Sequence, residues 1–220
     1  MRELARATLA RYDGESRGTR LHTRIRWRSC PFAQVADAVP AEGRVLEIGC
    51  GHGLFSTYLA LGSSDRTVLG TDVDGDKIRA AQRAAAGIAN LTFRPDEPGA
   101  FPDGPWDAVC IVDVLYLIDR DGERDLLATA ARHLAPGGVL VVKEMGTTPR
   151  WKFRWMALQE RLSVQVLGIT AGHDLTFVPP PELEGWMVAA GLVDVEHRPL
   201  DGGHLHTHHL VVSRKPAAPA

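Results

Sequence analysis

The feature that most constrains the fold is an alternation of short apolar runs, rich in β-branched residues, with longer runs of helical periodicity. The apolar runs are nearly continuous, which is typical of parallel strands that are covered on both faces. We expect strands at 45–48, 67–71, 91–94, 106–112, 139–143, 192–200 and 206–213, and helices at 54–61, 76–86, 123–134 and up to residue 190. This order predicts a doubly wound α/β fold.

The end of the chain departs from the alternation. The sequence DGG at 201–203 separates the last two expected strands by a turn that is too short for a helical crossover. Two strands joined in this way form a hairpin. We therefore expect a seven-stranded sheet whose last strand is antiparallel to its neighbours.

The expected domain organisation has one principal unit. Residues 43–214 form this unit, residues 1–42 an arginine-rich helical extension before it, and residues 215–220 a disordered tail. Between the fifth and sixth strands lies an insertion, at about 146–178, that carries an amphipathic, aromatic and basic run. The insertion therefore lies outside the strand–helix alternation.

Composition excludes several classes of protein. The net charge of −2 gives no general attraction to nucleic acid or to anionic membranes. Three cysteines without a CxxC pair argue against a disulfide framework or a structural zinc site, and they favour a reducing, cytoplasmic environment. The charged N-terminus does not resemble a signal peptide, and no apolar run approaches the ~20 residues that span a bilayer.

The stretch VLEIGCGHG, 45–53, joins the first strand to the first helix and contains three alternate glycines. Its pattern is GxGxG, with Leu54 where a dinucleotide fingerprint would have its third glycine, and the chain has no Walker sequence GKS or GKT. Glu47, two residues before the first glycine, would repel a pyrophosphate. The stretch therefore predicts a ligand with a positive charge at the carboxyl end of the first strand.

Five sequence blocks follow one another in the order found in one superfamily. The blocks are VLEIGCGHG at 45–53, GTDVDGDKI at 70–78, WDAVCIVDVLYLI at 106–118, LAPGGVLVVKE at 134–144 and PELEGWMVAAGLVDVEHRPL at 181–200. Together they resemble the class I S-adenosylmethionine (SAM) methyltransferases. The resemblance implies a Rossmann-like sheet and SAM as the cofactor.

The resemblance also implies a set of cofactor-binding residues. Glu47 would face the ammonium and sulfonium charges of SAM, Asp72 would bind the ribose hydroxyls, and Asp96 would meet the adenine amino group. Asp72 has an alternative role as the cap of the next helix, which we assign instead to Asp74. The remaining residues of the set are Gly49, Cys50, Gly51, Val73, Val112 and Asp113.

The sequence specifies the catalytic residues less well than the cofactor-binding residues. His204, His206 and His208 alternate in GGHLHTHHL, so on a strand they would share a face above the cofactor. One of them could act as a general base, or the set could bind a metal, although exposed turn histidines are an equally simple interpretation. Tyr116 could line the acceptor pocket or be a core aromatic, and Glu144 could be a base or a solvated side chain.

The flanking segments leave further alternatives open. The resemblance implies that the insertion at about 146–178 caps the active site and selects the substrate. The insertion could instead touch a membrane surface, form a dimer contact or pack against the sheet edge. The segment 14–32 of the N-terminal extension concentrates five arginines, which suit recognition of a carboxylate or phosphate but could also form a solvated face: Arg17, Arg20, Arg24, Arg26 and Arg28. His22 and Trp27 would reach the pocket if this extension folds over the cofactor.

The sequence therefore predicts SAM-dependent methyl transfer to a small, apolar or aromatic acceptor, with oxygen as the preferred acceptor atom. Methylation of RNA, protein or a carrier- or lipid-linked substrate is an alternative, and so are a nicotinamide oxidoreductase and a non-catalytic SAM-binding protein. The net charge and the lack of an (N/D)PPY sequence argue against nucleic acid as the substrate. The sequence leaves the oligomeric state open.

Overall fold

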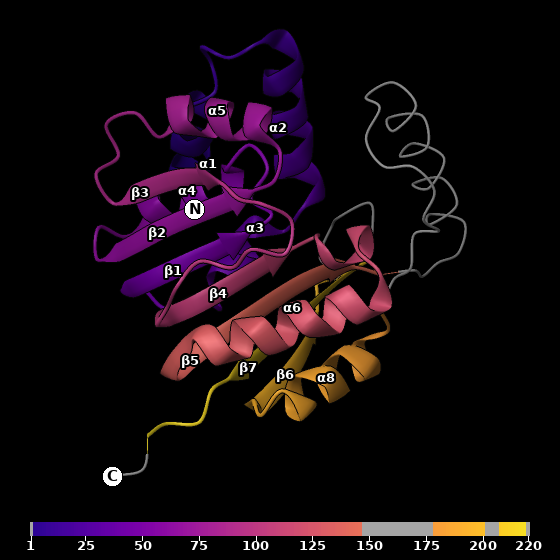
Figure 1. The fold of residues 1–220 in the computed structure, drawn as a ribbon. Helices are drawn as coiled ribbons and strands as arrows, with labels where there is room; N and C mark the ends of the chain where they lie inside the picture. Colours follow the sequence, from indigo (N-terminus) through magenta and orange to yellow (C-terminus); the bar gives the residue numbers. More distant parts are fainter. Residues whose placement is uncertain (1, 147–177, 201–206, 219–220) are drawn as a thin grey trace.

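The computed structural model describes residues 2–146, 178–200 and 207–218 of the chain (Figure 1). Its elements are α1 (Arg2–Ala10), α2 (Arg17–Ser29), α3 (Phe32–Ala36), β1 (Gly43–Ile48), α4 (Leu54–Gly62), β2 (Arg66–Asp72), α5 (Gly75–Ala84), β3 (Leu91–Pro95), β4 (Trp106–Val112), the 3₁₀ turn η1 (Leu115–Leu117), α6 (Arg120–His133), β5 (Leu134–Met145), α8 (Pro180–Ala189), β6 (Val193–Pro199) and β7 (His208–Arg214). The insertion at 146–178 and the turn at 201–206 lie almost wholly outside the described residues.

The strands form one sheet in the order β3-β2-β1-β4-β5-β7-β6 (Figure 1). The first five strands are parallel, whereas β7 pairs antiparallel with both β5 and β6. The predicted Rossmann-like sheet with an antiparallel last strand is therefore confirmed. Chain order reverses between β1 and β4, which makes the crevice at their carboxyl ends the expected place for a ligand.

Two apolar layers cover the sheet, one on each face. Because side chains alternate along a strand, Val141 joins one layer and its neighbours Leu140 and Val142 join the other. The first layer holds apolar residues of α3, α4 and α5, and the second holds those of α6 and α8. The N-terminal segment is attached to the first layer through Tyr12, which is 1% exposed and donates a hydrogen bond to the carbonyl of His52 at 2.8 Å.

Two element boundaries differ from the expectation for local reasons. Helix α6 begins at Arg120 rather than 123, because the carboxylate of Asp119 accepts the backbone N–H of Gly122 at 2.8 Å and caps the helix. Strand β5 begins at Leu134 and includes the PGG sequence, where the pairing with β4 shifts register. The sequence pattern predicts a strand that begins only at 139, but the residues before it pair with β4 across an irregularity within the strand.

No helix among the described residues is long and apolar enough to cross a membrane. Cys30, Cys50 and Cys110 are all buried free thiols.

Candidate functional site

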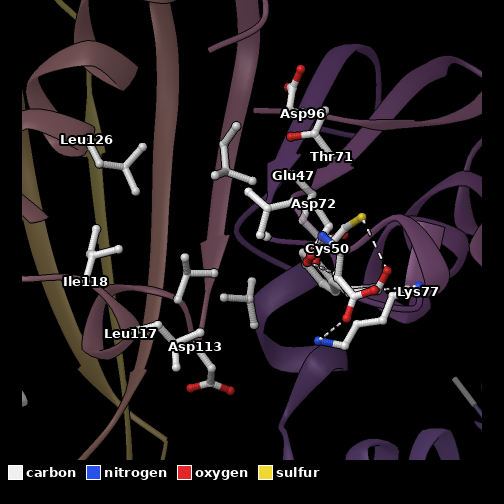
Figure 2. Close-up of a pocket in the computed structure, with 18 of the residues that line it drawn as sticks. Glu47, Cys50, Thr71, Asp72, Lys77, Asp96, Asp113, Leu117, Ile118 and Leu126 are labelled. Atoms are coloured by element: carbon white, nitrogen blue, oxygen red, sulfur yellow. Dashed lines mark hydrogen bonds and ion pairs between the residues drawn. The ribbon is translucent and has the colours of Figure 1, made fainter. Parts of the chain in front are cut away.

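A cavity of about 1500 Å³ lies above the carboxyl ends of β1, β2, β3 and β4. It is lined by all nine residues that the sequence predicts to bind the cofactor: Glu47, Gly49, Cys50, Gly51, Asp72, Val73, Asp96, Val112 and Asp113. Figure 2 shows a polar side with Glu47, Asp72 and Lys77 and an apolar side with Leu117, Ile118 and Leu126. The fold thus brings the predicted set together in one place, and the contact of each residue with the cofactor stays a prediction.

The three glycines of the loop after β1 have positive φ angles but serve different purposes. A Cβ atom added at Gly49 would lie 2.5 Å from Val114 Cγ2, and one at Gly53 would lie 2.3 Å from Phe93 Cζ. At Gly51, with φ of 55°, the nearest atom to an added Cβ would be Lys77 Cδ at 4.0 Å. Packing therefore requires glycine at Gly49 and Gly53, whereas Gly51 leaves open space for a ligand to approach the backbone.

Glu47 is the next-to-last residue of β1, and its side chain is buried at the wall of the cavity. Its carboxylate accepts the backbone N–H of Ser56 at 2.9 Å and also the Ser56 hydroxyl, so it holds the first turn of α4. Burial raises the pKa of Glu47 to about 7, although the Ser56 bonds oppose this shift. A nearby cationic ligand would favour its ionised form.

Asp72 ends β2, and its carboxylate is fixed in orientation by two backbone donors. One oxygen accepts the N–H of Gly51 at 2.7 Å and the other accepts the N–H of Asp74 at 2.9 Å. Each carboxylate oxygen keeps a further lone pair, so both can still accept a hydroxyl. Asp74 caps α5 by accepting the N–H groups of Asp76 and Lys77, which confirms the predicted division of roles in the helix cap.

Asp113 follows β4 and lies at the point where the sheet order reverses. It adopts a left-handed conformation, with φ of 57°, and its backbone N–H donates to the carbonyl of Lys143 at 2.8 Å. Its two carboxylate oxygens lie 2.6 and 2.7 Å from Nζ of the fully buried Lys143, and one lies 2.6 Å from Nη2 of Arg26. Burial opposes ionisation of Asp113, but the two cations outweigh it and lower its pKa to about 2.

Glu144 lies next to this charge cluster and is buried rather than solvated, which corrects one of the two sequence interpretations. One carboxyl oxygen accepts the N–H groups of Val114 and Leu115 at 3.1 and 3.0 Å, and the other has no hydrogen-bond partner among the described residues. Burial, together with the charge of Asp113, raises the pKa of Glu144 to about 8. The carboxyl group is therefore mainly protonated at pH 7.

Helix α2 covers one side of the cavity, as expected if the N-terminal extension folds over the cofactor. Its residues His22, Ile25, Arg26 and Ser29 line the cavity, whereas Trp27 packs against Phe32 and Tyr58 instead. The ring of His22 lies 4.9 Å from that of His52 in the glycine loop. Desolvation lowers the pKa of His22 to about 4, so this ring is neutral at pH 7.

The predicted catalytic residues are not all brought to the cavity. Tyr116, in η1, is half-buried and lines it. His208 is 1% exposed, pairs with Met145 across β7 and β5, and is not among the lining residues, so a base at this position has no support from the described geometry. His204 and His206 lie outside the described residues. Among the described residues, no group of three or more side chains is placed to hold a metal.

Two features of the site were not identified from the sequence. These are the specific position of Arg26 and the ion pair of Lys143 with Asp113. Lys143 had a recognisable signal, because an isolated lysine at the end of the apolar run VLVVK needs a buried partner. The parallel register places Lys143 opposite Val112, directly before Asp113. Arg26 had no such signal, since four other arginines lie in the same segment.

Comparisons with known proteins agree with this geometry. A model of the methyltransferase domain family matches residues 24–197. A ubiquinone biosynthesis O-methyltransferase of Caulobacter sp. (strain K31) is 33% identical over 177 residues, which cover 74% of this chain and 67% of that protein. A fatty-acid O-methyltransferase of Mycolicibacterium smegmatis is 40% identical over 112 residues, which cover 49% of this chain and 39% of that protein.

A solved structure of similar fold is a SAM-dependent methyltransferase of Methanosarcina mazei. It has a TM-score of 0.63 and 18% sequence identity, over 86% of this chain and 99% of that chain. This likeness supports the fold. The match to the fatty-acid O-methyltransferase spans well under two thirds of that relative's own length.

Proposed function

Because this chain belongs to the family of SAM-dependent methyltransferases, we propose that it transfers the methyl group to an oxygen atom of a small, apolar or aromatic acceptor. The observation that carries the proposal is the concentration of exposed apolar side chains at the cavity. Of the seven large hydrophobic side chains that are exposed among the described residues, Ile25, Val73, Leu117 and Ile118 line it. Apolar surface left open to water in this way is typical of a binding site for an apolar molecule.

The size of the cavity supports two ligands rather than one. Pockets for a single small molecule commonly have volumes of about 300–1000 Å³, and this one measures about 1500 Å³. The polar side, with Glu47, Asp72 and the open backbone at Gly51, fits the cofactor. The remaining space, next to Asp113 and Tyr116, fits a small acceptor.

The residues of this chain would contribute mainly position and electrostatics. When bound, SAM supplies a methyl group on a sulfonium sulfur, which is a good leaving group. Asp72 would hold the ribose hydroxyls, and Glu47 would favour the positive charges of the cofactor. Helix α2 and the apolar side chains would exclude water and keep the acceptor oxygen in line with the methyl group.

Oxygen is the acceptor atom that the relatives favour, since two of them are named O-methyltransferases. A hydroxyl acceptor has to lose its proton, and we keep His204 and His206 as candidate bases on the strength of the sequence pattern alone. Replacement of both by glutamine should then lower kcat most at high pH, where the wild-type base is deprotonated and can accept the proton, and should remove the rise of kcat with pH. An unchanged pH profile would remove this role from both.

The test of the proposed function has two steps. Calorimetry should first show micromolar binding of SAM or of its demethylated product, S-adenosylhomocysteine. Labelled SAM is then offered with a panel of phenols, lipophilic acids, long-chain alcohols and amines, and products are identified by mass spectrometry. Methylated oxygen in any of these acceptors supports the proposal, and methylation confined to amines contradicts it.

The alternative acceptors make different predictions. Binding to RNA would weaken steeply as salt concentration rises, which an electrophoretic titration measures. A carrier- or lipid-linked acceptor would be methylated only in its tethered form. A non-catalytic SAM-binding protein would bind both cofactor forms without transferring the methyl group to any member of the panel.

A further inference from the structure

Of the five arginines in the segment 14–32, one lines the cavity. Arg17, Arg24 and Arg28 lie on the exposed side of α2, Arg20 is half-buried, and none of these four lines the cavity. Arg26 lies on the opposite side of the helix, and its side chain retains 27% exposure. Helix α2 therefore exposes Arg17, Arg24 and Arg28 to solvent, whereas it directs Arg26 to the cavity.

The contact that Arg26 makes fixes it at the centre of the site. Its Nη2 lies 2.6 Å from Asp113, at the carboxyl end of β4 where the sheet order reverses. The other cationic side chains of the cavity wall lie elsewhere, because Lys77 pairs with Asp74 beyond β2 and Arg132 lies near the end of α6. Arg26 is thus placed where the acceptor must approach the methyl group.

The charges around Arg26 do not cancel. Lys143 already donates to both oxygens of Asp113, so this single carboxylate serves two cations. The neighbouring carboxyl of Glu144 is raised in pKa by burial and is mainly neutral at pH 7. The cluster of Arg26, Lys143, Asp113 and Glu144 therefore carries about one positive charge in excess, facing the cavity through Arg26.

We propose that Arg26 positions the acceptor and that the acceptor reacts through an anionic oxygen, either a carboxylate or an ionised phenol. This inference rests on the proposed O-methylation and names its substrate class. A guanidinium group presents five N–H donors in a planar fork, and the ion pair with Asp113 leaves donors for an oxyanion in the cavity. Exposed apolar side chains of the same cavity, such as Ile25 and Leu117, would hold the rest of the acceptor.

An anionic acceptor also simplifies the reaction. The acceptor oxygen uses a lone pair to form the new O–CH₃ bond, while the S–CH₃ bond breaks and its electron pair stays on sulfur. A carboxylate becomes a neutral methyl ester and a phenolate becomes a neutral ether, and no proton has to be removed during transfer. The neutral product then loses its attraction to Arg26, which favours its release.

The experiment compares wild type with Arg26→Gln, Arg26→Lys and the control Arg24→Gln, on the exposed side of the same helix. Decanoate and 1-decanol, which share a chain length, are titrated calorimetrically into protein saturated with S-adenosylhomocysteine at pH 7, and 4-nitrophenol and benzyl alcohol form the aromatic pair. Methyl transfer from labelled SAM is measured for the same four compounds.

We expect the anionic member of at least one pair to bind and react at least about 10-fold better than its neutral partner. Arg26→Gln should weaken anion binding about 10- to 100-fold, Arg26→Lys should retain part of it, and Arg24→Gln should change nothing. The pair that responds distinguishes a carboxylate from a phenolate acceptor.

Several results would overturn the inference. Equal binding of the neutral and anionic partners by wild type is one, and equal loss of both in Arg26→Gln is another. Loss of S-adenosylhomocysteine binding in both Arg26 variants would assign the residue to the cofactor instead. If anions bind through Arg26 but only amines are methylated, the proposed function fails while the anion site stands.

Discussion

The two sides of the cavity are built in different ways. On the cofactor side, the contacts join residues close in sequence, such as Glu47 with Ser56 and Asp72 with Gly51, which are 9 and 21 positions apart. On the acceptor side, Asp113 is held by Lys143, 30 positions away, and by Arg26 from the N-terminal helix. Local geometry thus shapes the first side, whereas packing of distant elements shapes the second.

This difference implies different consequences of substitution. The polar groups of the cofactor side lie at strand ends and line the cavity, so we expect their removal mainly to change ligand affinity. The charges of the acceptor side are largely buried and paired with one another, so removal of one leaves a partner with fewer ion-pair contacts in a medium of low polarity. Substitutions there should change stability as well as activity.

The largest expected effect is the loss of stability in Lys143→Met. Asp113 would keep Arg26 alone as its cation while remaining buried, and breaking a buried pair commonly costs about 3–5 kcal/mol. Denaturant unfolding measures the change. The double variant Lys143→Met/Asp113→Asn should recover part of the loss because the fully buried side chain at 113 then carries no charge, whereas Arg26, 27% exposed, can be solvated by water; a double variant as unstable as the single one would contradict this account.

Gly51 and Gly53, in the loop after β1, are a matched pair of positions whose substitution separates an effect on stability from an effect on cofactor binding. Gly53→Ala should lose about 2–4 kcal/mol, from its positive φ and from the contact with Phe93. Gly51→Ala should lose only the smaller backbone part, about 1–2 kcal/mol. Its added methyl group would enter the cavity, however, and reduce S-adenosylhomocysteine affinity about 10-fold. Thermal unfolding and calorimetry report the two effects, and a reversed order would show that Gly51 does not face the ligand.

Asp72→Ala should reduce S-adenosylhomocysteine affinity by about 100-fold, because two charge-assisted hydrogen bonds to ribose hydroxyls are lost. Calorimetric titration measures this loss directly. Asp76→Ala is the matched control, since Asp76 lies in the next helix with its side chain 86% exposed. Unchanged affinity in Asp72→Ala would leave Asp72 with a purely structural role in the glycine loop.

The smallest expected effect is a change in the pH dependence of stability in Glu144→Gln. The pKa of Glu144 in the folded chain, about 8, is above its ordinary value of 4.5, so between these values the folded state holds a proton that the unfolded state has released. Stability therefore falls as pH rises through this window. Glutamine should remove up to about 1.4 kcal/mol per pH unit of that slope.

The measurement is best made between pH 7 and 8. His22 contributes to the pH dependence of stability with the opposite sign. Because its pKa is lowered from 6.5, this contribution is confined to pH values below 6.5 and does not disturb the range from 7 to 8. Denaturant titrations at several pH values give the slope, with Glu42→Gln on the exposed surface as the control. Equal slopes in wild type and Glu144→Gln would show that Glu144 is ionised in the folded protein.

The sequence by itself determined the sheet and the cofactor side. Nearly continuous apolar runs and glycine-rich turns are local patterns, and residues that they place at strand ends, such as Glu47 and Asp72, line the cavity. The helix cap at Asp74 was predictable for the same reason, because it depends on residues two and three positions further along.

Only the tertiary structure decided the acceptor side. Five arginines in one segment are equivalent by composition, and the docking of α2 on the sheet selects Arg26 among them. Glu144 is an ordinary acidic residue in the sequence, and its burial and its contact with the turn after β4 raise its pKa. His208 shows the opposite case. The alternation of histidines suggested a catalytic role for it, but the residue is buried and is not part of the cavity wall. Burial and charge pairing depend on elements far apart in the chain, so a local pattern cannot specify them.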